Sequence, residues 1–221
     1  MSKKRSIIVC VLIACLLMAW VDGSSLDYVT KAILKILTFS LIPLFYFRLL
    51  EKSSIRSLFQ IKHTGLKVAL ILGLSSYALI IVIYFSFGYF FDLTLVSKIL
   101  EDNFGSGTLN FVPIAFYIAM INSFLEEFFF RGFAYLALVK VSSRRFASIF
   151  SSIMFALYHV FLMYGLFPFW LYISALGLMI IAGVLFNALD QPSKTILPSW
   201  LFHSLTNWGI NTIGFILLKI I

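Results

Sequence analysis

Residues 109–139 read LNFVPIAFYIAMINSFLEEFFFRGFAYLALV, an apolar run whose charged residues are Glu126, Glu127 and Arg131. A helix that spans a bilayer needs about 20 consecutive apolar residues, so this run is long enough to cross a membrane. An ionised side chain at bilayer depth costs several kcal/mol and marks a functional site by default. The run therefore predicts a membrane helix that carries chemically active residues.

The composition of the whole chain agrees with a membrane protein. Of the 221 residues, 62% are hydrophobic and 12% are charged, and the mean hydropathy is +1.03. Soluble domains contain about 25% charged residues. A soluble enzyme, a disordered chain and a disulfide scaffold are therefore excluded. Cys10 and Cys15 lie in one apolar run, where packing explains them better than a disulfide does.

About seven apolar segments, within a range of six to eight, have the length of a spanning helix. Short polar gaps separate these segments, and the chain shows no internal repeat and no linker. The predicted fold is an all-α, polytopic membrane bundle that forms a single membrane domain. The expected spans are 6–21, 32–50, 68–91, 109–139, 146–164, 169–188 and 196–218.

The first apolar run follows Lys3, Lys4 and Arg5, as it would in a signal peptide or in a first membrane span. Residues 12–15 also fit a lipoprotein cleavage box. The chain stays apolar after Cys15, however, where a mature lipoprotein would turn polar. The lipoprotein interpretation is therefore disfavoured, and the run is counted as the first span.

The net charge of +8 is concentrated in short gaps between the spans. Gaps 51–67, 140–145 and 189–195 hold most of the loop lysines and arginines, whereas the gap 92–108 is acidic and includes Asp92. Because cytoplasmic loops are enriched in Lys and Arg, the pattern predicts a cytoplasmic N-terminus and an external C-terminus. Anionic lipid is an expected partner. Nucleic acid is not, since basic and aromatic residues do not alternate on a polar surface.

Few titratable residues are expected at depth. Of nine acidic residues, only Glu126 and Glu127 lie in mid-span, and Asp190 is assigned to a gap. Lys35 lies near the outer end of its span and can extend to the interface. His63 is expected in a solvated loop. The set expected at depth is Glu126, Glu127, Arg131, His159 and His203, with Asn207 beside them.

The spacing allows these polar groups to meet. Glu126 and His159 lie equally far along the chain from the basic turn 140–145. In a helical hairpin both side chains would lie about 20 Å from that turn. His203 and Asn207 would lie about 10 Å and 16 Å from the cytoplasmic end of the last span. Three spans can therefore place these groups in one layer.

Helical periodicity decides which side chains share a face. Residues at i and i+4 are neighbours on a helix, so Glu127 can pair with Arg131, and His203 shares a face with Asn207. Glu126 points about 100° away from Glu127. One carboxylate can thus be neutralised by the arginine while the other faces a cavity.

A carboxylate and an imidazole can together deprotonate a water molecule. A second histidine and an asparagine can donate hydrogen bonds to the oxyanion of a tetrahedral intermediate. Glu126, His159 and His203 could instead bind zinc with an open water position, although the chain has no HExxH motif. The hypothesis of a serine hydrolase that uses Ser123 or Ser204 has less support, because neither residue lies in a G-x-S-x-G elbow.

The same residues resemble three motifs of the CPBP family, which comprises CAAX proteases and bacteriocin-processing enzymes and is also called the Abi family. Residues 126–132 match its EExxxR motif, residues 155–159 match FxxxH, and residues 203–207 match HxxxN. Each motif alone is weak, but three in order, each within an apolar span, are specific. The resemblance covers about residues 109–210.

The resemblance implies an intramembrane endopeptidase with a helical core. Carried over by motif, Glu126 and His159 would activate the water, and His203 and Asn207 would form the oxyanion site. A mechanism without metal is favoured because Asn207 suits an oxyanion donor better than a zinc ligand. No cofactor is therefore favoured, while zinc remains possible.

The resemblance also implies supporting residues and a division of the chain. Glu127 and Arg131 would support the catalytic groups, and Phe155 would pack beside them. Residues 109–221 would form the catalytic core, preceded by a three-span region at 1–108.

The small size resembles bacterial members of the family. It implies a bacterial cell membrane location, a peptide or membrane-anchored protein as substrate, and a role in bacteriocin immunity or peptide maturation. Two alternatives remain open. One is a non-enzymatic membrane immunity or binding protein, and the other is a proton-coupled transporter that uses Glu126 and His159 as a relay. No inverted repeat supports a transporter.

Overall fold

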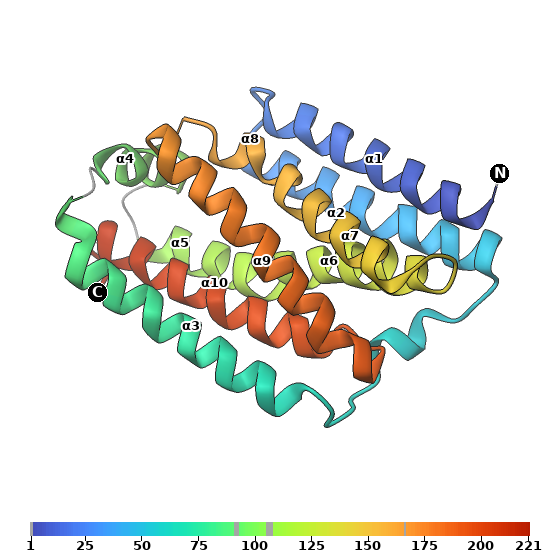
Figure 1. The fold of residues 1–221 in the computed structure, drawn as a ribbon. Helices are drawn as coiled ribbons and strands as arrows, with labels where there is room; N and C mark the ends of the chain where they lie inside the picture. Colours follow the sequence, from blue (N-terminus) through green and yellow to red (C-terminus); the bar gives the residue numbers. More distant parts are fainter. Residues whose placement is uncertain (1, 91–92, 105–107, 166) are drawn as a thin grey trace. The chain divides into compact units, whose positions relative to one another are not determined.

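The computed structural model describes residues 2–90, 93–104, 108–165 and 167–221. Within these ranges every regular element is helical and no strand occurs, which confirms the all-α prediction (Figure 1). Asp92, which was assigned to the acidic gap, lies outside the described residues.

Six helical segments of the described chain are long and apolar enough to cross a membrane. This number of spans lies within the predicted range of six to eight. Large apolar side chains such as Leu16, Phe85 and Leu178 are exposed on these segments, as expected of surfaces that face lipid. The chain is therefore an integral membrane protein. The segments are Lys3–Asp22, Tyr28–Glu51, Leu66–Phe90, Phe111–Ala137, Arg144–Met163 and Phe169–Ser193.

The expected seventh span forms helix α10, Leu197–Leu217. It is 21 residues long, which is enough to span a bilayer, but it is not one of the six. His203, Asn207 and Asn211 lower its apolar content. The expected orientation, with a cytoplasmic N-terminus, stays a prediction, and so does the expected division between residues 108 and 109.

The chain divides into two compact units that are not consecutive in sequence. The first unit comprises 1–65 and 125–199, and the second comprises 66–124 and 200–221. The first holds α1 (Lys3–Asp22), α2 (Tyr28–Phe45), η1 (Tyr46–Glu51), η2 (Ile55–Phe59), η5 (Phe128–Ala137), α7 (Arg144–Tyr158), α8 (Val160–Met163) and α9 (Phe169–Ser193). The second holds α3 (Leu66–Phe87), η3 (Gly88–Phe90), α4 (Thr94–Phe104), α5 (Thr108–Phe116), η4 (Tyr117–Asn122) and most of α10.

An aromatic cluster forms the centre of the first unit. The Phe39 ring of α2 stacks on Phe129 with centroids 4.4 Å apart, and the Phe130 and Tyr158 rings pack against it edge-on. All four side chains are almost completely buried. Aromatic pairs of this geometry contribute about 0.5–1.5 kcal/mol beyond their buried area. The cluster therefore holds α2, η5 and α7 together.

Small residues and hydroxyl groups organise the second unit. Gly73 of α3 lies against Leu205 of α10, so closely that an added Cβ would lie 2.6 Å from the leucine Cδ1. Ser76 and Thr206 share a hydrogen bond of 2.6 Å. The Asn211 amide donates to the carbonyl oxygen of Ala115. Glycine and polar contacts of this kind join helices in membranes, where no hydrophobic effect drives association.

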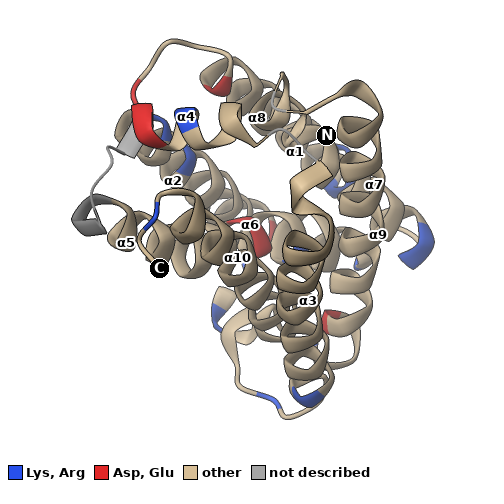
Figure 2. Cartoon of the chain, turned by 90° about the vertical axis from the view of Figure 1, so that its left-hand side faces the viewer, with Lys and Arg blue, Asp and Glu red and all other residues tan. Residues whose placement is uncertain are grey.

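The long run 109–139 forms a helix that is not α-helical throughout. The five-residue helix α6, Ser123–Glu127, lies between two π-helical segments, η4 and η5. Segments of π-helix are rare and occur frequently at functional sites. Both glutamates of the run lie in α6. Figure 2 shows acidic residues, in red, in this helix.

The prediction of a polar gap between helices at 189–195 is wrong over most of its length. Helix α9 continues to Ser193 and ends at Lys194, whose φ of 55° is left-handed. The gap was predicted because Asp190 and Pro192 are rare in membrane helices. Asp190 is instead fully buried within α9, because Ser199 supplies it with hydrogen bonds.

We expect Gly183→Ala to destabilise the first unit. A Cβ on Gly183 would lie 2.9 Å from both Cα and Cβ of Ser152 on α7, so α7 and α9 would have to separate. Overpacking of this kind costs about 1–3 kcal/mol. Thermal unfolding of the purified protein in detergent measures the loss as a lower Tm.

Gly177→Ala is the matched control on the same helix, because nothing lies within 4 Å of its Cβ position. Alanine is a better helix former than glycine by about 1 kcal/mol, so this variant should keep or raise the Tm. An equal fall in Tm for both variants would contradict the packing argument.

Candidate active site

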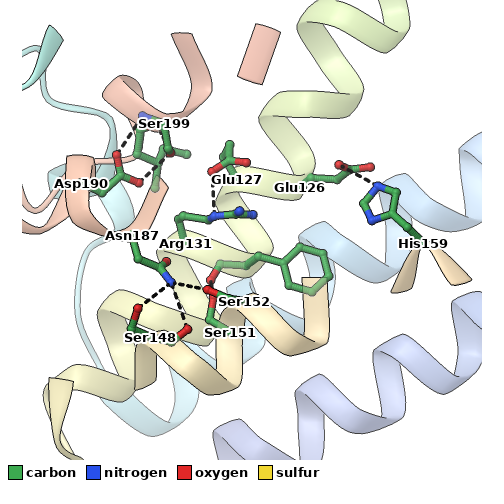
Figure 3. A network of polar contacts seen from close by, with 12 residues as sticks. Glu126, Glu127, Arg131, Ser148, Ser151, Ser152, His159, Asn187, Asp190 and Ser199 are labelled. Atoms are coloured by element: carbon green, nitrogen blue, oxygen red, sulfur yellow. Dashed lines mark hydrogen bonds and ion pairs between the residues drawn. The ribbon is translucent and has the colours of Figure 1, made fainter. Parts of the chain in front are cut away.

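Glu126 and His159 face one another across the helical hairpin that the sequence predicted. Glu126 lies in α6, and His159 immediately follows α7 (Figure 3). The Glu126 Oε2 atom lies 3.8 Å from His159 Nε2. The glutamate side chain is 2% exposed and the histidine side chain 14%. The predicted meeting of these two residues is confirmed.

The FxxxH spacing fixes the orientation of the imidazole. His159 Nδ1 lies 2.8 Å from the carbonyl oxygen of Phe155, one helical turn earlier. A carbonyl oxygen can only accept, so Nδ1 carries a proton and donates it. In the neutral ring, Nε2 is then the basic nitrogen. The Phe155 and Tyr158 rings lie edge-on to the imidazole and hold it in place. The basic nitrogen therefore points at Glu126.

Lys35 makes a contact with Glu126 that the sequence did not predict. Its ammonium lies 3.1 Å from Glu126 Oε1, and its side chain is 12% exposed. A lysine near the end of an apolar run ordinarily extends toward water, and here a buried carboxylate lies within its reach. The sequence gives no sign that α2 packs beside α6, so this contact was missed.

Glu127 and Arg131 form the ion pair that their i,i+4 spacing predicted. The Arg131 Nε atom lies 3.1 Å from Glu127 Oε2, and both side chains are fully buried. The guanidinium also lies over two aromatic rings, 4.2 Å from the centroid of Phe155 and 4.6 Å from that of Phe186. A cation over a ring face is attracted by its quadrupole. Phe155 therefore contacts Arg131 and His159 at once.

Asp190 and Asn187 extend the buried polar network and were not predicted as part of it. Asp190 accepts hydrogen bonds from the backbone N–H of Ser199, at 2.9 Å, and from its hydroxyl, at 2.6 Å. Asn187 donates to Ser148 and Ser152 of α7 (Figure 3). Ser199 lies in the first turn of α10, whose N–H groups have no partner within the helix. Asp190 thus caps the helix that carries His203 and Asn207.

His203 and Asn207 lie on α10, one helical turn apart, so they share a face as predicted. His203 is 7% exposed. One Asn207 amide hydrogen is donated to the carbonyl oxygen of Ile118, at 3.3 Å. An amide nitrogen carries two hydrogens, so a second donor remains. Both residues belong to the second unit, and their expected meeting with Glu126 and His159 stays a prediction.

The zinc alternative is not supported by the arrangement of donors. No group of three or more His, Cys, Asp or Glu side chains among the described residues could hold a metal ion. The Lys35 ammonium also contacts one oxygen of Glu126, and a positive charge there opposes a second cation. The described residues therefore do not support zinc as a cofactor.

Comparison with known proteins identifies the segment that carries these residues. Residues 108–209 match a family model described as type II CAAX prenyl endopeptidase Rce1-like. The resemblance to the CPBP family is confirmed. The CPBP-like segment contains all three motifs, from Glu126 to Asn207, whereas Lys35 lies outside it. No curated protein and no solved structure matches the chain significantly.

We expect Arg131→Met to destabilise the protein severely. The substitution leaves Glu127 buried without its cation, and removing one partner of a buried pair costs about 3–5 kcal/mol. The free energy of unfolding by denaturant in detergent measures the loss.

The double variant Glu127→Leu/Arg131→Met removes both charges and should recover much of the loss, because well-packed apolar residues often replace a buried pair at little cost. A double variant as unstable as Arg131→Met would show that the ion pair is not the cause.

Proposed function

We propose that the chain is an intramembrane endopeptidase in which Glu126 and His159 activate a water molecule. The observation that carries this proposal is the approach of Glu126 Oε2 and His159 Nε2 to 3.8 Å. The match of residues 108–209 to a prenyl endopeptidase family supports it. Two basic atoms at this separation can both bind one water molecule at ordinary hydrogen-bond lengths.

The proposed reaction needs no covalent enzyme intermediate. Glu126 takes a proton from the water, and the resulting hydroxide attacks the peptide carbonyl carbon. The carbonyl oxygen becomes an oxyanion, to which His203 and Asn207 donate hydrogen bonds. The tetrahedral intermediate collapses, the C–N bond breaks, and the proton held by Glu126 or His159 passes to the leaving nitrogen. The products are a carboxylic acid and an amine, and the acid then ionises to a carboxylate by giving its proton to the amine or to water.

The buried pair beside the site has a supporting role in this proposal. Arg131 neutralises Glu127, so Glu126 is not adjacent to an uncompensated negative charge. Phe155 holds the ring of His159 through its carbonyl oxygen and its own ring. Neither Arg131 nor Phe155 needs to touch the substrate. Asp190 accepts a hydrogen bond from the backbone N–H of Ser199 and so stabilises the N-terminal turn of α10. His203 lies farther along the same helix.

The proposed substrate is a peptide or a membrane-anchored protein, because the reactive residues lie on helices that can span a bilayer. The matching family is described as a CAAX prenyl endopeptidase family, so a prenylated CAAX peptide is one candidate substrate. A bacterial location and a role in bacteriocin immunity or peptide maturation remain proposals that rest on the resemblance to the CPBP family.

Glu126→Gln should abolish cleavage while the protein remains folded and inserted. Glutamine has nearly the same shape but cannot accept the proton from water, and loss of a general base costs about 100- to 10,000-fold in rate. Glu101→Gln is the matched control, since Glu101 is an exposed residue of α4. Hydrolysis of a quenched fluorescent peptide with a prenylated cysteine, in proteoliposomes, measures the rate. Wild-type cleavage by Glu126→Gln would refute the proposal.

The substrate can be named by comparing protein termini in cells that carry the wild type or Glu126→Gln at equal membrane levels. Termini present only with the wild type would establish proteolysis. Identical termini, with the variant still conferring the wild-type phenotype, would favour an immunity or binding protein. Proton-driven uptake by proteoliposomes would favour a transporter.

A second prediction concerns metal dependence. Because Lys35 neutralises Glu126 and no described group of donors suits zinc, we expect cleavage to continue at the wild-type rate after exhaustive dialysis against a strong chelator. Loss of activity on chelation, restored by added zinc, would show that a metal takes part.

A further inference from the structure

Lys35 is a charged residue that contacts Glu126 and that none of the three motifs contains. It lies on α2, far in sequence from the matched segment 108–209, yet its ammonium lies 3.1 Å from Glu126 Oε1. From this contact we propose that Lys35 is the positioning residue for the catalytic carboxylate. The proposal rests on the proposed function, because it assigns to Lys35 a role that is exerted through Glu126.

The ion pair between Lys35 and Glu126 is buried, and burial makes its electrostatic interaction stronger than that of an exposed pair. Exposed ion pairs contribute little because water screens them, but Glu126 is 2% exposed and Lys35 is 12% exposed. Removing one partner of such a pair leaves an uncompensated charge in an apolar environment. The carboxylate would then turn toward another donor. Lys35 therefore decides where the carboxylate points.

The two oxygens of Glu126 have different neighbours. Oε1 accepts from Lys35 and Oε2 faces His159 Nε2. A carboxylate is planar, so fixing Oε1 also fixes the direction of Oε2. The oxygen that accepts the proton from water is thereby held toward the imidazole. A shift of about 1 Å in a catalytic group can cost about 100-fold in rate.

Lys35 also contacts the helix that carries the histidine. Its ammonium lies 4.9 Å from the centroid of the Tyr158 ring, and Tyr158 immediately precedes His159. Attraction between the cation and the ring keeps α2 beside the end of α7. One side chain thus touches Glu126 and the residue before His159, which ties together the two helices that form the catalytic pair.

The pairing also gives each of the two adjacent glutamates its own cation in an apolar bundle. Glu127 has Arg131 as its cation, and Glu126 has Lys35. Asp22, at the end of α1, lies in the field of Lys35, Lys31 and Glu126. Lys31 itself donates to the backbone carbonyl of Asp22, at 3.0 Å, and does not contact either glutamate. Lys31 is therefore a matched control on the same helix.

The test compares Lys35→Met, Lys35→Arg, Lys31→Met and Glu126→Gln in proteoliposomes, with the quenched prenylated peptide as the probe. We expect Lys35→Met to lower kcat about 10- to 100-fold with KM nearly unchanged, because the base is misplaced and the substrate site is not. Lys35→Arg keeps the cation and should recover most of the rate. Lys31→Met should match the wild type.

A wild-type kcat in Lys35→Met, or an equal loss in Lys35→Met and Lys35→Arg, would overturn the proposal. If Lys35→Met were active and Glu126→Gln inactive, only the role of Lys35 would fail. If Glu126→Gln were also active, the proposed function would fail.

Unfolding of the same variants in detergent provides a test that needs no substrate. A double-mutant cycle of Lys35→Met and Glu126→Gln should show that the two losses of stability do not add, as expected for residues in contact. Additive losses would show that the two side chains do not interact, and would overturn the proposal without bearing on the reaction.

Discussion

Two adjacent carboxylates in an apolar bundle each require a cation, and this requirement organises the first unit of the protein. Arg131 provides the cation for Glu127 from the next helical turn, and Lys35 provides the cation for Glu126 from α2. The first pair is local, whereas the second brings together segments far apart in sequence. Around the glutamates, each buried negative charge is therefore paired with a cation inside the apolar packing.

The aromatic side chains make the ion pairs effective. Rings of Phe155 and Phe186 lie over the guanidinium of Arg131, and the Phe39 cluster fills the space between α2, η5 and α7. These rings exclude water, and electrostatic interactions strengthen where water is excluded. The proposed water activation by Glu126 and His159 would take place in such a setting. The π-helical segments on both sides of α6 fit this view, since such segments occur often at functional sites.

Local spacing in the sequence predicted the parts of the site that lie within one helix or one hairpin. Glu127 pairs with Arg131, and Phe155 orients His159, because i and i+4 residues are neighbours on any helix. The meeting of Glu126 and His159 follows from their equal distance from the basic turn. Lys35 and Asp190 could not be placed in this way. Each lies near the end of an apolar run, where a loop or an interface position is the ordinary expectation, and each has its partner on another helix.

The sequence by itself determined that the chain is an all-α membrane protein and that three polar motifs lie on its helices. Composition and helical periodicity require no knowledge of which helices pack together. Only the tertiary structure decided which cation compensates Glu126 and which carboxylate caps α10. The physical reason is that a buried charge takes the partner that packing brings within about 3–4 Å, and the distance between two residues along the chain does not reveal that packing.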